Sequence, residues 1–291
     1  MDGKIIRGIG GFYYVHTGNG VYACKARGIF RKENIRPLPG DLVQIEVLDE
    51  AAKEGSIERI RPRKNALIRP AVANVDQILV IFAADRPKPN FNLLDRFLVT
   101  MERQQLNCAL VFNKKDLATQ ERLREITGHC AGSGYPLSFV SAQSGEGVEK
   151  LRSLLRGKTS AVAGPSGVGK SSLINLLQDQ VRMDTGDISR KISRGRHTTR
   201  HTELLFVEED TYILDTPGFS TIDISGMDKE ELGDCFPEIK SRKDGCRFAG
   251  CSHLSEPDCR VAQALSDGEI SRGRYENYRL FYEEIKGKKK Y

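Results

Sequence analysis

The sequence predicts a multidomain protein in which a small β-barrel, an α/β domain with a mostly parallel sheet and a mostly helical domain follow one another. Short β-type runs separated by glycine and proline turns fill residues 1–66, and strand and helix patterns alternate over residues 67–225. Three of the seven cysteines then fall within Cys246–Cys259, in a segment (226–291) otherwise rich in helix formers. A chain of 291 residues is about twice the size of a common domain, so more than one domain is expected.

The composition excludes a membrane protein and argues against secretion. The longest apolar run, near Ile78–Ala84, is far shorter than the roughly 18–20 residues that a membrane-spanning helix needs. The first residues lack the apolar core of a signal peptide. An odd number of cysteines with one local cluster is typical of reduced thiols and a metal site rather than of a disulfide framework. We therefore expect a cytoplasmic protein with no membrane partner.

The net charge of +6 is uneven along the chain. Residues 1–66 carry a net charge of +4, residues 67–225 carry +2, and residues 226–291 are balanced although they end in a lysine-rich run. A basic excess at one end is compatible with a nucleic-acid partner, and a solvated surface explains it equally well.

The first domain is expected to be a five-stranded barrel of the oligonucleotide-binding (OB) type, without a helix. Its strands are expected at residues 4–9, 12–16, 21–26, 41–47 and 56–61. Four aromatic residues near basic side chains have two open interpretations, as stacking platforms for bases or as barrel core, and the second is favoured for each taken singly. They are Tyr13, Tyr14, Tyr22 and Phe30.

The second domain is expected to have helices on both faces of its sheet. Its strands are expected at residues 75–83, 108–112, 137–140, 160–163, 204–207 and 211–214. Its helices are expected at residues 93–104, 120–127, 147–155 and 170–177. In the last domain, helices are expected at residues 260–265 and 273–285.

The segment after Ala163 matches the phosphate-binding pattern G-x-x-x-x-G-K-[ST] between an expected strand and an expected helix. The backbone N–H groups of such a loop surround phosphate oxygens, while Lys170 reaches the β- and γ-phosphates and the Ser171 hydroxyl ligates Mg²⁺. The expected phosphate cradle consists of Gly164, Pro165, Ser166, Gly167, Val168, Gly169, Lys170, Ser171 and Ser172.

A second phosphate-side motif, Asp215-Thr216-Pro217-Gly218, directly follows the last expected strand. Asp215 can hold Mg²⁺ through water, and the Gly218 N–H can contact the γ-phosphate. On its own this segment would be interpreted as an ordinary turn, and the phosphate-binding loop is what favours the functional interpretation.

An N-K-x-D motif at the end of another strand predicts guanine recognition. The Asp116 carboxylate can accept hydrogen bonds from guanine N1–H and the exocyclic amine, a donor pair that adenine lacks. Asn113 either supports the loop or contacts the base edge, and the stem of Lys114 can lie over the ring. After the next strand, the small residues Ser141 and Ala142 let a backbone N–H approach guanine O6.

The order of these motifs differs from that of ordinary Ras-like GTPases, in which the phosphate-binding loop comes first. Here the base-reading loops precede the phosphate-binding loop, and the 215–218 segment comes last. The same sheet can still form, because domain ends often lie close together and permutation is tolerated. We therefore expect a circularly permuted Ras-like α/β domain whose last switch segment leads into residues 226–291 and links them to nucleotide state.

This motif order, with a small β domain in front and a cysteine cluster behind, resembles the circularly permuted, ribosome small-subunit-dependent GTPases (the RsgA, YjeQ or YloQ family). The resemblance covers essentially the whole chain. It implies a bacterial GTP hydrolase that binds the small (30S) ribosomal subunit and its 16S rRNA late in maturation, and we expect the protein to be a monomer. Because rRNA phosphates can order the basic loop 190–201, we also expect the subunit to stimulate hydrolysis of GTP to GDP and phosphate.

The basic segment Arg190–His201 lacks hydrophobic periodicity and is expected to be a loop that contacts rRNA. The resemblance favours Thr199, with Thr198 as the alternative, as the residue that completes the Mg²⁺ shell when GTP is bound. Phe219 stands where many GTPases have a water-orienting Gln, so another group must position the water. The resemblance makes His197 the catalytic candidate, and a solvated loop residue or an RNA contact is the alternative.

Three thiolates and one imidazole occur within 14 residues in the pattern Cys246-x4-Cys251-x-His253-x5-Cys259. This donor set predicts one structural Zn²⁺ in a closed tetrahedral site, with no open position for water. Unpaired buried cysteines or an iron–sulfur cluster are the alternatives, and the family pattern matches at all four positions. The other cysteines are expected to be reduced and mostly buried: Cys24, Cys108, Cys130 and Cys235.

Three functions compete at this point. The first is a GTPase checkpoint on the small ribosomal subunit. The second is a nucleotide-sensing RNA-binding scaffold in which hydrolysis is incidental. The third is a P-loop kinase or ATPase acting on a small molecule, and Asp116 argues against it.

Overall fold

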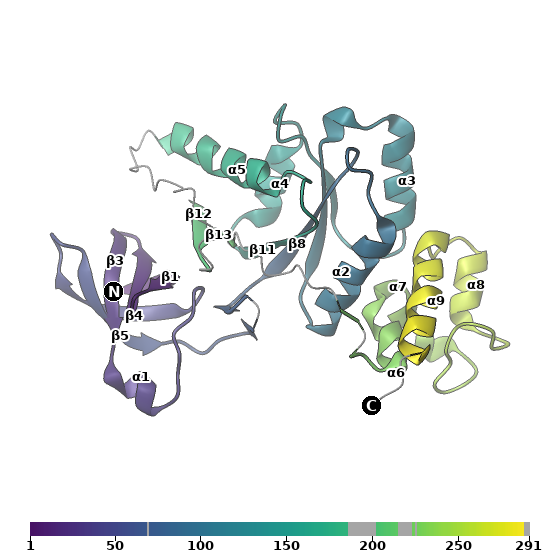
Figure 1. Cartoon of the computed structure of the whole chain (residues 1–291), viewed down its shortest axis with the longest axis horizontal. Coiled ribbons are helices and arrows are strands. Elements are labelled where there is room, and N and C mark those ends of the chain that lie inside the picture. The colour runs from purple at the N-terminus through teal and green to yellow at the C-terminus, as the bar shows by residue number, and fades with distance from the viewer. Residues whose placement is uncertain (69, 186–201, 215–222, 225, 288–291) are drawn as a thin grey trace. The chain divides into compact units, whose positions relative to one another are not determined.

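The computed structural model describes residues 1–68, 70–185, 202–214, 223–224 and 226–287 (Figure 1). Its contacts divide the chain into two compact units, which are described separately below. The first unit consists of Met1–Asp76, Arg152–Val162 and Ile174–Phe219, and the second of Gln77–Leu151, Ala163–Leu173 and Ser220–Tyr291. Among the described residues, we find no helix with the length and apolarity needed to cross a membrane. The predicted domain boundaries at residues 66/67 and 225/226 stay predictions.

The N-terminal strands form a closed five-stranded barrel, as predicted. In chain order they are β1 (Asp2–Ile9), β2 (Phe12–Thr17), β3 (Gly20–Ala26), β4 (Leu42–Asp49) and β5 (Glu54–Ile60). The order around the barrel is β1-β2-β3-β5-β4, with β3 and β5 parallel and the other described pairs antiparallel. A two-stranded ribbon follows, consisting of β6 (Ala66–Leu67) and β7 (Val72–Ala73).

One prediction for this barrel, the absence of a helix, was wrong. A short helix, α1 (Gly28–Lys32), lies between β3 and β4, and its five residues are too few to show a helical repeat of apolar positions. Tyr22 and Phe30 are buried in the barrel core, which confirms the favoured of the two interpretations for these two residues. Tyr13 and Tyr14 are half-buried.

The central sheet has the strand order β10-β9-β8-β11-β13-β12. Its strands are β8 (Gln77–Ala83), β9 (Cys108–Asn113), β10 (Leu137–Phe139), β11 (Thr159–Ala163), β12 (Leu204–Glu208) and β13 (Thr211–Leu214). Strand β12 is antiparallel to β13, and β10, β9 and β8 are parallel, as are β11 and β13. All residues of β8 are buried, which explains why its sequence is apolar without interruption after Gln77.

Four helices accompany the sheet close to the predicted positions. They are α2 (Phe91–Arg103), α3 (Gln120–Cys130), α4 (Val148–Leu155) and α5 (Lys170–Thr185). Helix α2 begins where Asn90 accepts a hydrogen bond from Leu93 N, at 3.0 Å, and α3 begins in the same way at Thr119. These caps explain helix starts that periodicity alone placed only approximately.

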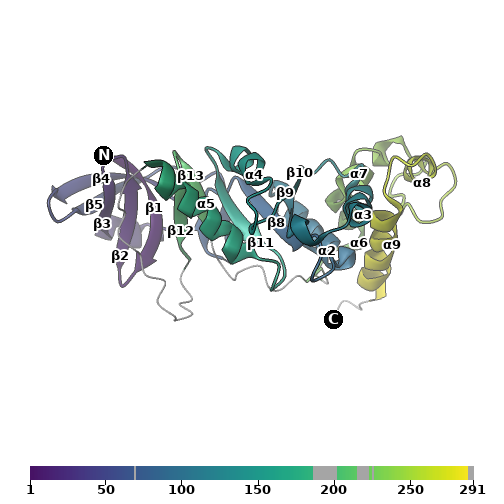
Figure 2. The same cartoon turned by 90° about the horizontal axis from the view of Figure 1, so that it is seen from above.

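The C-terminal region is helical, as predicted. Its helices are α6 (Lys229–Leu232), α7 (Pro237–Lys240), α8 (Arg260–Ser266) and α9 (Arg272–Gly287). Within the second unit, α9 lies against α2 and α3 (Figure 2). Val99 of α2 belongs to the same apolar cluster as Phe236, Tyr278 and Phe281. The C-terminal helices therefore share their core with a helix that follows the first strand of the sheet.

The cysteines outside the cluster behave as predicted. Cys24, Cys108, Cys130 and Cys235 are all buried, and none forms a disulfide. Burial raises the pKa of Cys24 to about 11 and is the first cause of the rise at Cys235 to about 12. These thiols are therefore protonated near neutral pH and behave as small apolar residues.

Candidate functional site

The predicted phosphate cradle is a loop between β11, which ends at Ala163, and α5, which begins at Lys170. Glycine is required at both of its ends. Gly164 has φ +136°, and a Cβ there would lie 2.0 Å from Ile81 O. Gly169 has φ +89°, and a Cβ there would lie 2.4 Å from Asn113 Nδ2. The loop therefore packs against two neighbouring strand ends so closely that no side chain fits between them.

Asn113 joins the predicted phosphate and guanine loops. Its side chain is buried, and Nδ2 donates to Val168 O at 3.0 Å. Its Oδ1 accepts from Ala142 N at 3.0 Å. In the structure Asn113 thus holds three loops together, and its contact with the base stays a prediction.

Lys114 makes a second bridge from its loop to the phosphate-binding loop. Its backbone adopts the left-handed conformation, with φ +61°, which is uncommon for a residue with a side chain. Its Nζ donates to Gly167 O at 2.8 Å and to Arg86 O at 2.7 Å. The lysine stem is thus fixed along the edge of the phosphate-binding loop.

Asp116 and Ser141, predicted at the guanine site, lie together. The Ser141 hydroxyl donates to Asp116 Oδ1, and it accepts from Ser144 N at 3.1 Å. Ser141 is fully buried, whereas Asp116 is exposed. A buried hydroxyl therefore orients a carboxylate that faces the outside of the loop.

Lys170 begins α5 with its side chain folded over the phosphate-binding loop. Its Nζ donates to Gly164 O at 2.9 Å and to Pro165 O at 2.6 Å. The following residues, Ser171 and Ser172, are exposed in the first turn of the helix. Hydroxyl groups at a helix start next to a glycine-rich loop are well placed for a phosphate and its counter-ion.

The predicted switch residues fall outside the described part of the chain. They are His197, Thr198, Thr199, Asp215 and Gly218. The structure brings together the predicted residues of the phosphate cradle and the guanine loops, and it leaves these five as predictions.

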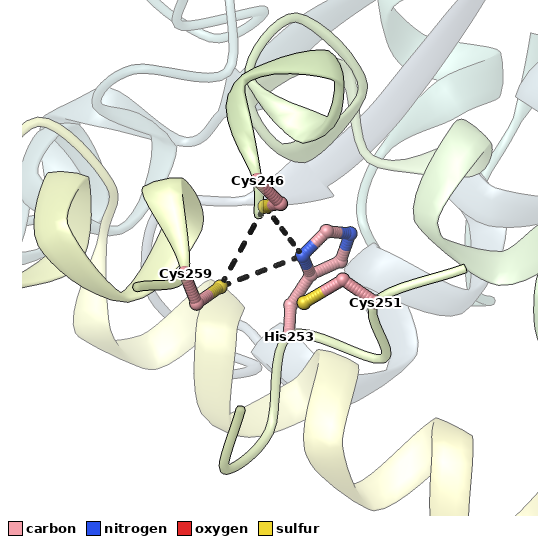
Figure 3. A group of neighbouring side chains, drawn as sticks. All are labelled: Cys246, Cys251, His253 and Cys259. Carbon is pink, nitrogen blue, oxygen red and sulfur yellow. Dashed lines mark hydrogen bonds between the residues drawn. The ribbon is translucent and has the colours of Figure 1, made fainter. Parts of the chain in front are cut away.

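The predicted metal ligands form one cluster (Figure 3). One donor atom from each of Cys246, Cys251, His253 and Cys259 lies within 4.8 Å of all the others. Nδ1 of the histidine lies 3.6 Å from Sγ of Cys246 and 3.6 Å from Sγ of Cys259, and these two sulfurs are 3.9 Å apart. The cluster can hold a metal ion.

Sequence reasoning missed the residues that hold the cluster's loop. The Glu256 carboxylate accepts from Ser252 N and from the Ser252 hydroxyl, both at 2.6 Å. Burial acts to raise the pKa of Glu256, but these and other hydrogen bonds outweigh it and lower the pKa to about 2. Two tyrosines of α9 also donate to the loop: Tyr275 to His253 O and Tyr278 to Ser252 O. Nothing in the cysteine spacing indicates these residues.

Two family models match the chain. The model of the RsgA GTPase matches residues 60–225, more than half of the chain, and the model of the RsgA N-terminal domain matches residues 2–57. The chain belongs to the RsgA GTPase family. It is therefore a GTPase, and its fold is that of an N-terminal barrel, a circularly permuted GTPase domain and a C-terminal helical region.

Similarity to proteins of this family extends over the full length. A protein of *Agathobacter rectalis* named "Small ribosomal subunit biogenesis GTPase RsgA" is 54% identical, with 100% of each chain covered. One of the same name from *Alkaliphilus metalliredigens* is 46% identical over 99% of each. The crystal structure of YjeQ from *Thermotoga maritima* is 35% identical with a TM-score of 0.81, over 99% of each chain. That of YloQ, described as a circularly permuted GTPase, is 36% identical with a TM-score of 0.80, over 100% of this chain and 96% of its own.

Proposed function

We propose that this chain binds GTP at the junction of the 113–116, 141–142 and 164–172 loops and acts as a GTPase in the biogenesis of the small ribosomal subunit. The observation that carries the nucleotide site is the bridge from Asn113 and Lys114 to carbonyl groups of the phosphate-binding loop. It sets the guanine-reading carboxylate of Asp116 at a fixed place relative to the phosphate cradle. A nucleotide that fits both loops is selected by its base and its phosphates together.

Hydrolysis requires groups that neutralise phosphate charge and orient water. Within the described residues, Lys170 supplies a cation at the phosphate-binding loop. A magnesium ion bound with the nucleotide adds Lewis acidity, and Ser171, Thr199 and Asp215 are the residues proposed to hold it. We assign orientation of the attacking water to His197, since the side chain of Phe219 can neither donate nor accept a hydrogen bond. Gly218 is proposed to contact the γ-phosphate through its N–H.

The proposed partner is the small ribosomal subunit through its 16S rRNA. The relatives are named for small-subunit biogenesis, and this chain matches them from end to end. The basic excess of residues 1–66 supports a contact with RNA phosphates. In this proposal the protein is a cytoplasmic monomer, and hydrolysis on the subunit releases it from a mature particle.

The proposed ion of the cysteine cluster is Zn²⁺. Zinc–sulfur and zinc–nitrogen bonds of about 2.3 and 2.0–2.1 Å in tetrahedral geometry place two donor sulfurs roughly 3.8 Å apart and sulfur and nitrogen roughly 3.6 Å apart. The separations of 3.9, 3.6 and 3.6 Å fit this arrangement. Four protein donors leave no position for water, so the ion is structural.

A change of base specificity from guanine to xanthine tests the nucleotide site. Asp116→Asn should lower GTP affinity about ten- to a hundredfold, because the carboxylate hydrogen bonds to the base are lost. The same variant should gain affinity for xanthosine triphosphate, whose base has a carbonyl group where guanine has the exocyclic amine. Lys115→Met is the matched control, since Lys115 pairs with Glu146 on the loop surface. Unchanged GTP affinity in Asp116→Asn would contradict the assignment.

Addition of purified small subunits tests the partner and the switch. We expect a slow GTPase rate alone and a faster rate with subunits, and stronger cosedimentation with a non-hydrolysable GTP analogue than with GDP. His197→Ala should keep GTP affinity and slow turnover on the subunit. Equal rates with and without subunits would contradict the coupling. Normal release of a hydrolysis-deficient variant would instead favour the RNA-binding scaffold.

A further inference from the structure

The loop Cys251–Cys259 supplies three of the four donors of the metal cluster, and a single carboxylate organises its interior. Besides the two bonds from Ser252, Glu256 Oε2 accepts from Leu254 N at 3.0 Å and from Ser255 N at 3.1 Å. One side chain thus receives four hydrogen bonds, three of them from backbone N–H groups within a span of four residues. Two of the donating residues, Ser252 and Leu254, stand directly before and after His253 in the sequence.

His253 needs such support because its backbone is strained. Its φ is +60°, in the left-handed region that favours glycine. Its carbonyl accepts from the Tyr275 hydroxyl at 2.7 Å, and the carbonyl of Ser252 accepts from the Tyr278 hydroxyl at 2.7 Å. Glu256 therefore holds the N–H groups around the histidine, while two tyrosines of α9 hold the carbonyl groups.

We propose that Glu256, together with Tyr275, is a positioning residue of the metal site: it holds His253 in its ligating arrangement before the metal binds and so sets metal affinity. Groups behind the ligands of a metal site commonly orient the ligands in this way. A loop held in advance loses less conformational freedom on binding, which strengthens the complex. The inference rests on the proposed metal site and adds residues to it.

The experiment measures Zn²⁺ affinity and the rate of Zn²⁺ release to a chromophoric chelator, with the full-length, zinc-loaded protein. Glu256→Ala should weaken Zn²⁺ binding about ten- to a hundredfold. Glu256→Gln, which keeps one acceptor oxygen, should fall between Glu256→Ala and the unsubstituted protein. Tyr275→Phe removes only the hydroxyl bonded to His253 O, and it should speed release by a smaller factor.

Asp258→Asn is the matched control. Asp258 lies in the same loop, also has a left-handed backbone, and pairs with Arg247 at the surface. The Asp258→Asn substitution removes one negative charge, as Glu256→Gln does, but leaves the hydrogen bonds to Glu256 in place. The Zn²⁺ affinity of this variant should therefore be unchanged. Co²⁺-substituted protein gives a second measurement, because its visible absorption reports ligand geometry. We expect altered bands in Glu256→Ala and unaltered bands in Asp258→Asn.

The outcomes separate this inference from the proposed metal site. If the unsubstituted protein takes up no Zn²⁺, the metal site itself is wrong. If it binds Zn²⁺ tightly and the Glu256 and Tyr275 variants bind it equally well, the positioning role is overturned while the metal site stands. Should Glu256→Ala not fold, Glu256→Gln and Tyr275→Phe decide the question.

Discussion

The N-terminal barrel and the C-terminal helices are attached to the GTPase part of the chain by different chemistry. In the first unit, the barrel meets the hairpin β12–β13 through what we call the barrel junction: Lys4, Arg7, His16, Glu203 and Tyr212. His16 Nδ1 lies 2.8 Å from the Tyr212 hydroxyl, and Arg7 pairs with Glu203 at 3.3 Å. Lys4 Nζ lies 4.1 Å from the centre of the Tyr212 ring. Most of these groups are only partly shielded from water; the Arg7 and Glu203 side chains, for example, are 26% and 33% exposed.

In the second unit, the attachment is a buried charge cluster, which we call the helical junction: Asp95, His129, Glu238, Arg274 and Asn277. Arg274 of α9 donates to Asp95 Oδ1 of α2 at 2.6 Å and also to the Glu238 carboxylate. Asp95 Oδ2 accepts from Asn277 Nδ2 at 2.6 Å and lies 3.1 Å from His129 Nε2. The Arg274 side chain is 2% exposed and those of Asp95 and Glu238 are fully buried.

The difference predicts how easily each attachment separates. Half-exposed polar contacts exchange with water at little cost, so the barrel junction contributes modestly to stability. A buried charge that loses its partner cannot be solvated, so the helical junction breaks only when the surrounding core opens. We therefore expect the C-terminal helices to unfold together with α2, whereas the barrel can separate from its hairpin independently.

The largest effect should come from Arg274→Met. It leaves Asp95 and Glu238 buried without a cation, which should lower the free energy of unfolding by about 3–5 kcal/mol. Urea denaturation followed by circular dichroism measures the loss, and hydrogen exchange in α9 locates it.

The control for this substitution lies on the same helix. Arg279 forms an exposed pair with Glu276, so Arg279→Met should cost less than about 1 kcal/mol. Combining Arg274→Met with Asp95→Asn should recover part of the loss, because one uncompensated charge is then removed. Equal losses for the two arginine variants would contradict the distinction between the junctions.

The elements and loops were predictable where the signal is local. The strands of the barrel and the sheet follow from alternation or continuous apolarity within a few residues, and β13 lies at its predicted position. The phosphate-binding loop is contiguous, so its residue types and spacing sufficed to predict its place between a strand and a helix.

The contacts that join distant segments could not be predicted. Asn113 bonds to Val168, 55 residues away, and its loop-supporting role depends on that contact. Asp95, Glu238 and Arg274 each look like ordinary surface charges in the sequence, and only the fold brings them together. The sequence alone does not distinguish Tyr22, which is buried in the barrel core, from an exposed aromatic residue of a barrel strand.

Within the barrel junction, Tyr212→Phe should have the larger effect. Burial is the first cause that raises the Tyr212 pKa to about 12, so its hydroxyl stays protonated near neutral pH and shares a hydrogen bond with His16 Nδ1. Loss of the hydroxyl should lower the stability of this contact by about 0.5–1.5 kcal/mol, while the ring remains beneath Lys4. Hydrogen exchange of the β12–β13 amides measures this. In a His16→Ala background, Tyr212→Phe should cause little further loss of stability. If the losses from the two substitutions add fully, the contact between the two side chains is contradicted.

A smaller effect should come from protonation of His16, which makes the stability of the barrel junction depend on pH. Burial, together with nearby Lys4, lowers the His16 pKa, although Asp210 opposes this. The folded state therefore favours the neutral imidazole, whereas the unfolded chain takes up a proton near its usual pKa of about 6.5. The contribution of His16 to the stability of the folded state is complete above that pH and is lost as the pH falls below it. Hydrogen exchange at pH values above and below this window should show the loss, and His16→Ala should remove the His16-dependent part.

The smallest effect should come from the Arg7–Glu203 pair. Since both side chains reach water, their coupling in a double-mutant cycle with Arg7→Ala and Glu203→Ala should be about 0.2–1 kcal/mol and should shrink in high salt. Arg7→Ala alone should cost more than the coupling, because the Arg7 guanidinium also stacks 4.1 Å from the centre of the Tyr14 ring. A salt-insensitive coupling of several kcal/mol would mean that the barrel junction is as firmly closed as the helical junction. The contrast between the two attachments would then fail, and with it the expectation that the barrel separates independently.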